Sequence, residues 1–270
     1  MKRIRATVKY LGKKFWGWQI QPQLPTVQEE IQRGLHQITG LNIRVTASGR
    51  TDRGVHALGQ VIHFDIPDQY ILSDFRYSIN SVIDPDIFLC WLEQVHPQFH
   101  SVRDAVQRHY LYLLNMGNYS PFHQDLLWQI PYELDIDQMK SAAAYLEGNH
   151  DFTSLVLTKS SQPDNQVNMK SVSIRRSGSL VIFHFCANRF LHKMIRTIMG
   201  TLVDVGKNKI PPHHLMKILA GKDRKLAGET APPEGLYLYK VLYPDHFNGI
   251  NSKFEEIDFS TKDIIEIFFR

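Results

Sequence analysis

One carboxylate, Asp52, lies between two arginines in the segment SGRTDRGVH at residues 48–56, with a glycine on either side of the group. A turn aspartate commonly accepts hydrogen bonds from neighbouring backbone amides, and this is the plainest interpretation. However, apolar runs precede and follow the segment, so it lacks the pattern of a solvated charged face. An acid in a closed pocket needs a cationic partner, and such a pair about 4 Å apart attracts by roughly 4 kcal/mol at an effective dielectric of 20.

An ionised, desolvated carboxylate can act as a nucleophile or as a base. The flanking glycines would let a bulky ligand approach the backbone closely. We therefore predict Asp52 as the catalytic residue and its neighbour Arg50 as a substrate-binding residue.

The segment RFLHKMIRTIMGTLVDVG at 189–206 predicts a helix with a continuous apolar face. Asn188, His192 and Arg196 follow one another at four-residue steps, which would place them on another face of that helix. A solvated outer face is the simpler interpretation. Because much of the helix is apolar, we instead expect Arg196 to be buried and to reach a carboxylate.

Aromatic and basic residues recur in two places. Tyr110 lies in a predicted strand at 108–116, where a core position is the default and a stacking platform for a base, worth about 1–3 kcal/mol, is the alternative. The segment KKFWGWQIQPQ at 13–23 interleaves lysines with aromatics, which suits loop or single-stranded RNA. Further cations offer phosphate contacts: Lys207, Lys209, Lys222, Arg224 and Lys225.

The chain has 270 residues, of which 43% are hydrophobic and 11% aromatic, enough for a sizeable core. Its net charge of +4 permits a nucleic-acid partner without requiring one. No apolar run approaches the roughly 20 residues that span a bilayer, and the basic N-terminus lacks the apolar block of a signal peptide, so we expect a cytoplasmic protein without a membrane partner. Cys90 and Cys186 are expected to be buried free thiols.

Hydrophobic periodicity predicts the same order of elements twice, strand-helix-strand-strand-helix-strand. The first set is 2–10, 26–39, 43–48, 60–66, 73–83 and 87–95, with a capping box between Thr26 and Glu29 and a stop at Gly40. The second set is 108–116, 135–148, 170–176, 180–188, 189–206 and 235–243. The predicted fold is α+β, with two ferredoxin-like halves that share an extended mixed, mainly antiparallel sheet, helices on one face and a central cleft.

These elements divide the chain into three parts. We predict an N-terminal half at 1–105 that carries the aspartate loop, and a C-terminal half at 106–244 that carries the tyrosine and arginine of the cleft. An extension of unknown role follows at 245–270, where a resumed apolar pattern is compatible with an extra helix. The polar segment 153–170 is predicted to be a loop, also without an assigned role.

Several activities lack their motifs. The sequence contains no GxxxxGK[ST], no GxGxxG after a strand and no CxxC, so nucleotide cradles and structural zinc are not supported. Two alternatives stay open: an RNA-binding module without chemistry, and a metal-dependent hydrolase that uses His56 and His63. The seven-residue separation of these histidines and the missing HExxH pattern disfavour the metal site.

The segment GRTDRGVHALGQVIHF at 49–64 resembles the signature of the tRNA pseudouridine synthase A family. The resemblance extends over nearly the whole chain to about residue 244. The other matching segments are YLGKKFWGWQ at 10–19, TVQ at 26–28, RHYLY at 108–112, GNHDF at 148–152, FLHKMIR at 190–196 and APPEGL at 231–236. Because these motifs occur in the family's order, the match is highly specific.

The resemblance implies an isomerase without cofactor or metal, which converts uridine to pseudouridine at positions 38, 39 and 40 of the anticodon stem-loop of tRNA. It implies that Asp52 is the nucleophile, Tyr110 the base-contacting tyrosine, Arg196 the partner of the aspartate, and Leu236 an apolar pocket residue. It also implies a homodimer that cradles tRNA. Whether the aspartate attacks the sugar C1′, attacks C6 of the base, or assists loss of the C2′ proton stays open.

Three positions depart from the family pattern. Arg53 replaces the usual alanine beside the nucleophile, Lys193 a common histidine, and Thr197 a common asparagine. None of them removes a group that the resemblance makes catalytic. Arg53 would add a phosphate contact or alter the range of substrates, and the sequence does not decide between these effects. Which tRNAs and which uridines are modified is also left open.

Overall fold

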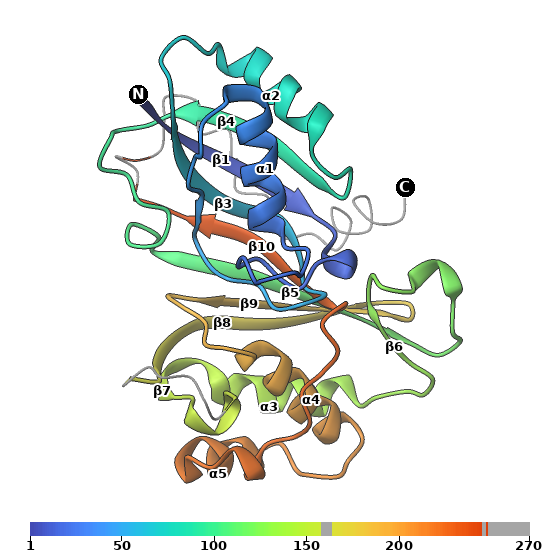
Figure 1. Cartoon of the computed structure of the whole chain (residues 1–270). Helices are drawn as coiled ribbons and strands as arrows, with labels where there is room; N and C mark the ends of the chain where they lie inside the picture. The colour runs from blue at the N-terminus through green and yellow to red at the C-terminus, as the bar shows by residue number, and fades with distance from the viewer. Residues whose placement is uncertain (158–163, 245–246, 248–270) are drawn as a thin grey trace.

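The computed structural model describes residues 1–157, 164–244 and 247 of the chain, and within them the strands form one large sheet (Figure 1). The strands are β1 (Lys2–Tyr10), β2 (Thr46–Ala47), β3 (His56–Ile66), β4 (Ile87–Gln94), β5 (Gln107–Met116), β6 (Trp128–Ile130), β7 (Gly148–Asp151), β8 (Gln166–Ser177), β9 (Leu180–Ala187) and β10 (Leu236–Leu242). The α-helices are α1 (Val27–Thr39), α2 (Leu72–Val82), α3 (Ile136–Ala143), α4 (Met194–Gly206) and α5 (His214–Gly221). None of these helices is long and apolar enough to cross a membrane.

The sheet has the order β4-β1-β3-β10-β5-β9-β8-β7, with β2 beside β3 and β6 beside β5. Numbered within its own half, each set of four strands follows the order 4-1-3-2, which is the ferredoxin-like arrangement that the doubled pattern predicts. The halves join where β10 runs parallel to β3, with Tyr237 opposite His56 and Leu238 opposite Ala57. The β5–β6 pair is also parallel and the other strand pairs are antiparallel, so the predicted mixed sheet is confirmed.

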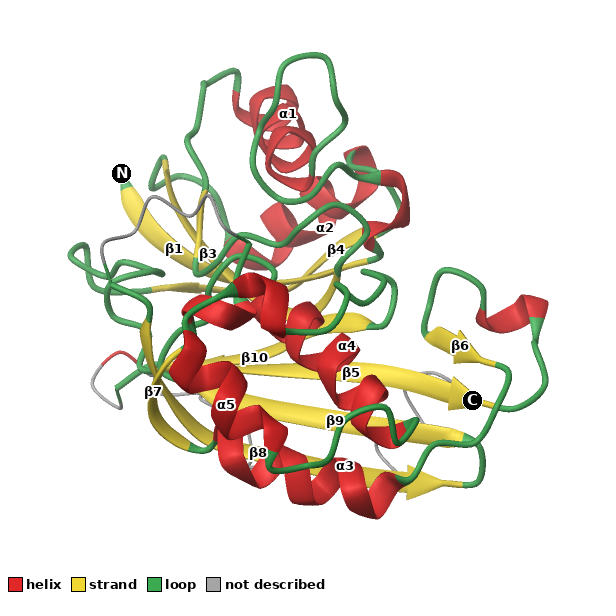
Figure 2. Cartoon of the chain, turned by 90° about the horizontal axis from the view of Figure 1, so that it is seen from below, coloured by secondary structure: helices red, strands yellow, loops and turns green. Residues whose placement is uncertain are grey.

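The helices cover one face of the sheet, α1 and α2 over the N-terminal half and α3, α4 and α5 over the C-terminal half (Figure 2). The apolar face predicted for α1 is buried through Val27, Ile31 and Leu35, and the helix ends at Gly40 in a left-handed conformation with φ of 71°. Burial of such side chains stabilises the fold by about 1.5–3 kcal/mol each relative to exposure. The amphipathic pattern therefore fixes which side of each helix meets the sheet.

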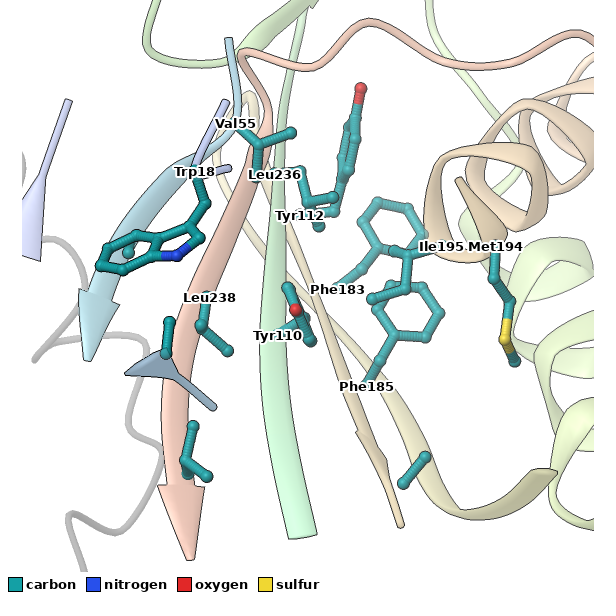
Figure 3. Close-up of a cluster of buried hydrophobic side chains, with 14 of the residues drawn as sticks. Trp18, Val55, Tyr110, Tyr112, Phe183, Phe185, Met194, Ile195, Leu236 and Leu238 are labelled. Carbon is teal, nitrogen blue, oxygen red and sulfur yellow. The ribbon is translucent and has the colours of Figure 1, made fainter. Parts of the chain in front are cut away.

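Apolar side chains from β5, β9, β10 and α4 form one continuous cluster at the junction of the halves (Figure 3). Tyr110 lies there beside Phe185 of β9 and Leu238 of β10, its partners in strand register. Ile195 of α4 closes the cluster from the helix side. Because α4 packs on the strands β5, β9 and β10 through this cluster, it keeps Tyr110 and α4 at a fixed separation.

Several predicted boundaries are wrong. The helix predicted from 189 begins at Met194, because Lys193 adopts a left-handed conformation with φ of 57° and residues 188–193 form an irregular turn. Thr26 precedes α1 but makes no side-chain capping bond. The segment predicted as a loop at 153–170 contains the start of β8, since residues 166–169 pair with β7. β6, β7 and α5 were not predicted, and the predicted extension lies outside the described residues except Phe247.

Candidate active site

A cleft of about 1420 Å³ lies between the two halves. All five predicted site residues line it: Arg50, Asp52, Tyr110, Arg196 and Leu236. They come from the loop between β2 and β3, from β5, from the first turn of α4 and from the start of β10. The fold thus brings together residues that are up to 186 positions apart in the sequence, counted from Arg50 to Leu236.

Asp52 has a cationic partner from the other half. Its Oδ2 lies 3.2 Å from Nη1 of Arg196, and its Oδ1 lies 3.4 Å from Nε2 of His192. The Asp52 side chain is 23% exposed and that of Arg196 is 12% exposed. One carboxylate therefore faces the cleft while both of its oxygens have nitrogen neighbours, a geometry that orients the acid.

Arg196 is itself held in place by backbone groups. Its Nε donates to the carbonyl oxygen of Ala231 at 2.8 Å, and its own carbonyl accepts from the Ala231 amide at 2.9 Å. One edge of the guanidinium is thereby fixed, and Nη1 is directed at Asp52. The segment around Ala231 contributes no side chain to this pair, so its part is to aim the arginine.

The loop that carries Asp52 is bonded to the preceding loop at 12–19. The Trp18 amide donates to the carbonyl of Thr51 at 3.0 Å, and the hydroxyls of Tyr10 and Thr51 are 2.9 Å apart. Gly17 adopts φ of +93°, and a Cβ added there would lie 2.6 Å from the Thr51 carbonyl oxygen. Only glycine fits such a close approach at this φ. The position of Asp52 thus depends on the packing of two loops against each other.

Tyr110 lines the cleft but is only 8% exposed. Its ring meets the edge of Phe190 at a centroid distance of 4.9 Å and an interplanar angle of 75°. Burial, more than the neighbouring charges, raises the pKa of its phenol, so the hydroxyl is neutral. The open stacking platform that the sequence suggested is therefore mostly covered in this conformation.

The other predicted residues differ in exposure. Arg50 is exposed, whereas Leu236 is buried. Tyr112, which alternates with Tyr110, is fully buried and donates its hydroxyl to the Pro232 carbonyl at 2.8 Å, so it is part of the core.

Positive charge is concentrated in the cleft. Eight Lys and Arg residues line it against three Asp and Glu, an excess of five that exceeds the net charge of +4 of the whole chain. The cations are Lys13, Arg44, Arg50, Arg53, Arg108, Arg189, Lys193 and Arg196, and the acids are Asp52, Asp125 and Glu234. A concave surface with this excess attracts polyanions.

The two histidines of the metal alternative are engaged elsewhere. His56 is fully buried, stacks on Tyr237 and accepts through Nδ1 from the Gly12 amide at 2.9 Å. His63 Nδ1 lies 2.9 Å from Oγ of Ser101. Among the described residues no group of three or more His, Cys, Asp or Glu is arranged to hold a metal. His56 and His63 therefore have separate structural partners and do not form a ligand pair.

Two features of the site were missed. The contact of His192 with Asp52 depends on the left-handed turn at Lys193, whereas the sequence placed His192 with Arg196 on one face of a continuous helix and predicted no contact with Asp52. The Arg108 guanidinium donates to carbonyls of Val102, Ala105 and Asn188, and burial lowers its pKa. These bonds tie the start of β5 to the segment that precedes it and to the residue that follows β9.

Comparisons with known proteins give the family of the chain. Residues 6–107 and 142–244 match a family model described as tRNA pseudouridine synthase. The chain belongs to the tRNA pseudouridine synthase family. Within that family it is similar to proteins named tRNA pseudouridine synthase A.

Three of these relatives are bacterial. The protein of Oceanobacillus iheyensis is 38% identical over 253 residues, which are 93% of this chain and 100% of the relative. That of Brevibacillus brevis is 39% identical over 244 residues, 90% of this chain and 100% of the relative. That of Geobacillus sp. is 40% identical over 249 residues, 90% of this chain and 98% of the relative. Among solved structures, an archaeal box H/ACA sRNP Nop10-Cbf5 complex matches 74% of this chain and 44% of its own, with 11% identity and a TM-score of 0.33.

Proposed function

We propose that this protein isomerises uridine to pseudouridine in tRNA, at positions 38, 39 and 40 of the anticodon stem-loop, with Asp52 as nucleophile and without a cofactor. The observation that carries the proposal is the pair of Asp52 and Arg196, 3.2 Å apart across a cationic cleft. Membership of the family supports the reaction and the class of substrate.

The reaction breaks the N-glycosidic bond of uridine, rotates the uracil and rejoins it to the sugar through C5, while the proton on C5 is released and the freed N1 takes up a proton. All other atoms are retained, so an acid and a cavity that holds the free base account for the rearrangement. The uridine must first leave its stack, which costs a few kcal/mol. Asp52 then attacks C1′ or C6, or takes the C2′ proton, and these three routes share the requirement for an ionised carboxylate.

Each of the remaining residues has a proposed part. Arg196 holds the Asp52 carboxylate in position and directs it into the cleft. Tyr110 contacts the base, and since its ring is mostly covered by Phe190, contact requires the base to enter beside that pair. Leu236 supplies an apolar wall, and the exposed Arg50 binds the RNA.

The proposal also covers the oligomeric state, the cellular location and the domain organisation of the protein. We propose that the protein acts as a homodimer in the cytoplasm, and that its two working units are residues 1–105 and 106–244. Sedimentation at the concentration of the activity assay tests the dimer, and a monomeric active species would contradict it.

The Asp52→Asn variant tests the chemistry. It keeps the size and hydrogen-bonding reach of the side chain but lacks the charge of a nucleophile, so we expect wild-type binding of tRNA and no pseudouridine. Release of tritium from tRNA labelled at C5 of uridine measures turnover, and carbodiimide primer extension locates the product. Appreciable product from the variant would refute the role of Asp52, while a wild-type protein that binds tRNA without releasing tritium would be an RNA-binding module.

A further inference from the structure

Arg53 and Trp16 form a stacked pair beside the proposed nucleophile. The guanidinium carbon of Arg53 lies 3.7 Å from the centroid of the Trp16 ring, and both residues line the cleft. Trp16 is 38% exposed and Arg53 is exposed, so the pair faces solvent at the entrance and not the core. A guanidinium over an indole face is attracted by about 0.5–1 kcal/mol at an exposed site.

The pair has a fixed place relative to Asp52. Arg53 follows Asp52 directly in the chain, and Trp16 lies in the loop that is bonded to the Asp52 loop. The Trp16 amide donates to the Pro25 carbonyl at 2.8 Å, and the Trp16 carbonyl accepts from Nε2 of Gln21 at 2.8 Å. The Gly54 amide donates to the Phe15 carbonyl at 3.4 Å. Trp16 is therefore anchored through its own backbone, and Arg53 through that of its neighbour Gly54.

The guanidinium has donors to spare. No carboxylate among the described residues forms an ion pair with Arg53, whereas Arg196 faces Asp52 and Arg189 faces Asp164. The indole lies over one face of the guanidinium, whose N–H groups form no hydrogen bond within the described part of the chain. A planar fork of N–H donors matches the two free oxygens of a phosphodiester. The stack therefore restricts the rotation of the Arg53 guanidinium, a group that pairs well with phosphate.

We propose that the Arg53–Trp16 stack is a phosphate-binding element that grips the RNA backbone next to the uridine extruded into the cleft. This proposal rests on the proposed function, since it takes the substrate to be RNA. Extrusion brings the phosphates that flank the target nucleotide close to the loop that carries Asp52, and Arg53 directly follows Asp52 in that loop. Trp16 acts as a positioning residue that holds the Arg53 fork in its plane.

Three variants distinguish the contribution of the Arg53 charge from those of its forked N–H donors and of the Trp16 ring that supports it. Arg53→Ala removes one phosphate contact, so we expect the KM for tRNA to rise about tenfold, the salt slope of binding to fall by about one, and kcat to stay unchanged. Arg53→Lys keeps the charge and loses the fork, so it should retain the salt slope and regain only part of the affinity. Trp16→Ala leaves Arg53 unsupported and should give a rise in KM smaller than that of Arg53→Ala. Arg33→Ala, which removes an exposed charge from α1 outside the cleft, is the matched control and should bind as wild type.

A neutral linkage in the RNA identifies the contact itself. Transcripts of a tRNA are prepared with a single methylphosphonate at each linkage that flanks the modified uridine. One position should cost wild-type protein about tenfold in affinity and cost Arg53→Ala nothing further, because the two changes remove the same contact. If Arg53→Ala loses as much as wild type at every linkage, or binds with wild-type affinity and salt slope, the proposal is wrong.

These outcomes are distinct from failure of the proposed function. A wild-type protein that makes no pseudouridine would refute the function, while the affinity and salt measurements would still report whether Arg53 contacts a phosphate.

Discussion

At the scale of single residues, the site depends on one carboxylate whose cation is delivered from 144 residues further along the chain. Arg196 touches Asp52 through Nη1 and the Ala231 carbonyl through Nε, and these two contacts use different corners of one rigid group. A lysine carries the same charge on a single nitrogen and cannot make both contacts. Charge alone therefore does not reproduce what Arg196 does.

The Arg196→Lys variant is expected to lower kcat roughly 100-fold with little change in tRNA binding, since misplacement of a reacting group by about 1 Å costs that much. Single-turnover release of tritium at saturating protein measures the chemical step, and a filter-binding titration measures affinity. A variant with wild-type single-turnover rate would show that the aim of the guanidinium is unimportant.

The residue types of the site were predictable, but some of their contacts were not. Asp52 and Arg196 were marked by charge in apolar surroundings, and the structure pairs them. The contact of His192 was not predictable as a helical neighbour, since a left-handed Lys193 breaks the helical spacing on which that expectation was based. The contact of Phe190 with the Tyr110 ring could not be predicted either, because it depends on how the turn at 188–193 folds back on β5.

At the scale of elements, the loop that carries Asp52 is positioned by the loop at 12–19, and Gly17 is one of the points where the two loops approach closely. The left-handed φ there strains any other residue, and the Thr51 carbonyl leaves no room for a methyl group. Gly117 has a similar φ of +101°, but an added Cβ would meet nothing within 4 Å. A comparison of the two positions therefore distinguishes backbone strain, which a side chain would cause at both, from steric collision, which it would cause only at Gly17.

We expect Gly17→Ala to destabilise the protein by more than Gly117→Ala, which should cost about 1 kcal/mol from the positive φ alone. The Gly17 variant should also lose activity beyond its loss of stability, because the collision displaces the residue before Asp52. Urea unfolding and tritium release on both variants decide this. Equal destabilisation with full activity in both would show that the loops can separate without consequence.

The elements themselves were mostly predictable, and the errors have physical causes. β1, α1 and α2 were recognised because their apolar residues recur at period 2.0 or 3.6 along one buried face, and β4 and β5 because their apolar residues form a continuous run. β6 and β7 have three and four residues, too few to display a period. α5 has buried Leu215, Ile218 and Leu219 at helical spacing, a signal that was present but lay within a short segment of eight residues.

At the scale of the molecule, four buried or half-buried histidines link stability to pH. The pKa values of His56, His63, His109 and His184 are each lowered to about 4, first of all by burial. Nδ1 of His109 and Nε2 of His184 lie 3.0 Å apart, so neither ring gains a proton without disturbing the other. The unfolded chain binds these protons near pH 6.5, whereas the folded protein does not until about pH 4.

Stability should therefore be constant above about pH 7 and should fall as the pH drops from 6.5 toward 4, by up to roughly 1.4 kcal/mol per pH unit for each histidine. Urea midpoints between pH 8 and pH 4.5 measure this. His56→Asn keeps an acceptor for the Gly12 amide but does not titrate, so its stability should fall less steeply over the same range. Identical midpoints at pH 7 and pH 5 in wild-type protein would contradict the linkage.

The parallel pairing of β10 with β3 has a consequence for biosynthesis. The segment bearing Asp52 leaves the ribosome long before the strand that closes the central sheet, and the helix bearing Arg196 is made in between. A nascent chain therefore contains Asp52 early, but it acquires Arg196 and the strand β10, which joins the two halves, only near the end of translation. Products of synthesis interrupted before α4 therefore lack the Asp52–Arg196 pair, and we expect them to make no pseudouridine.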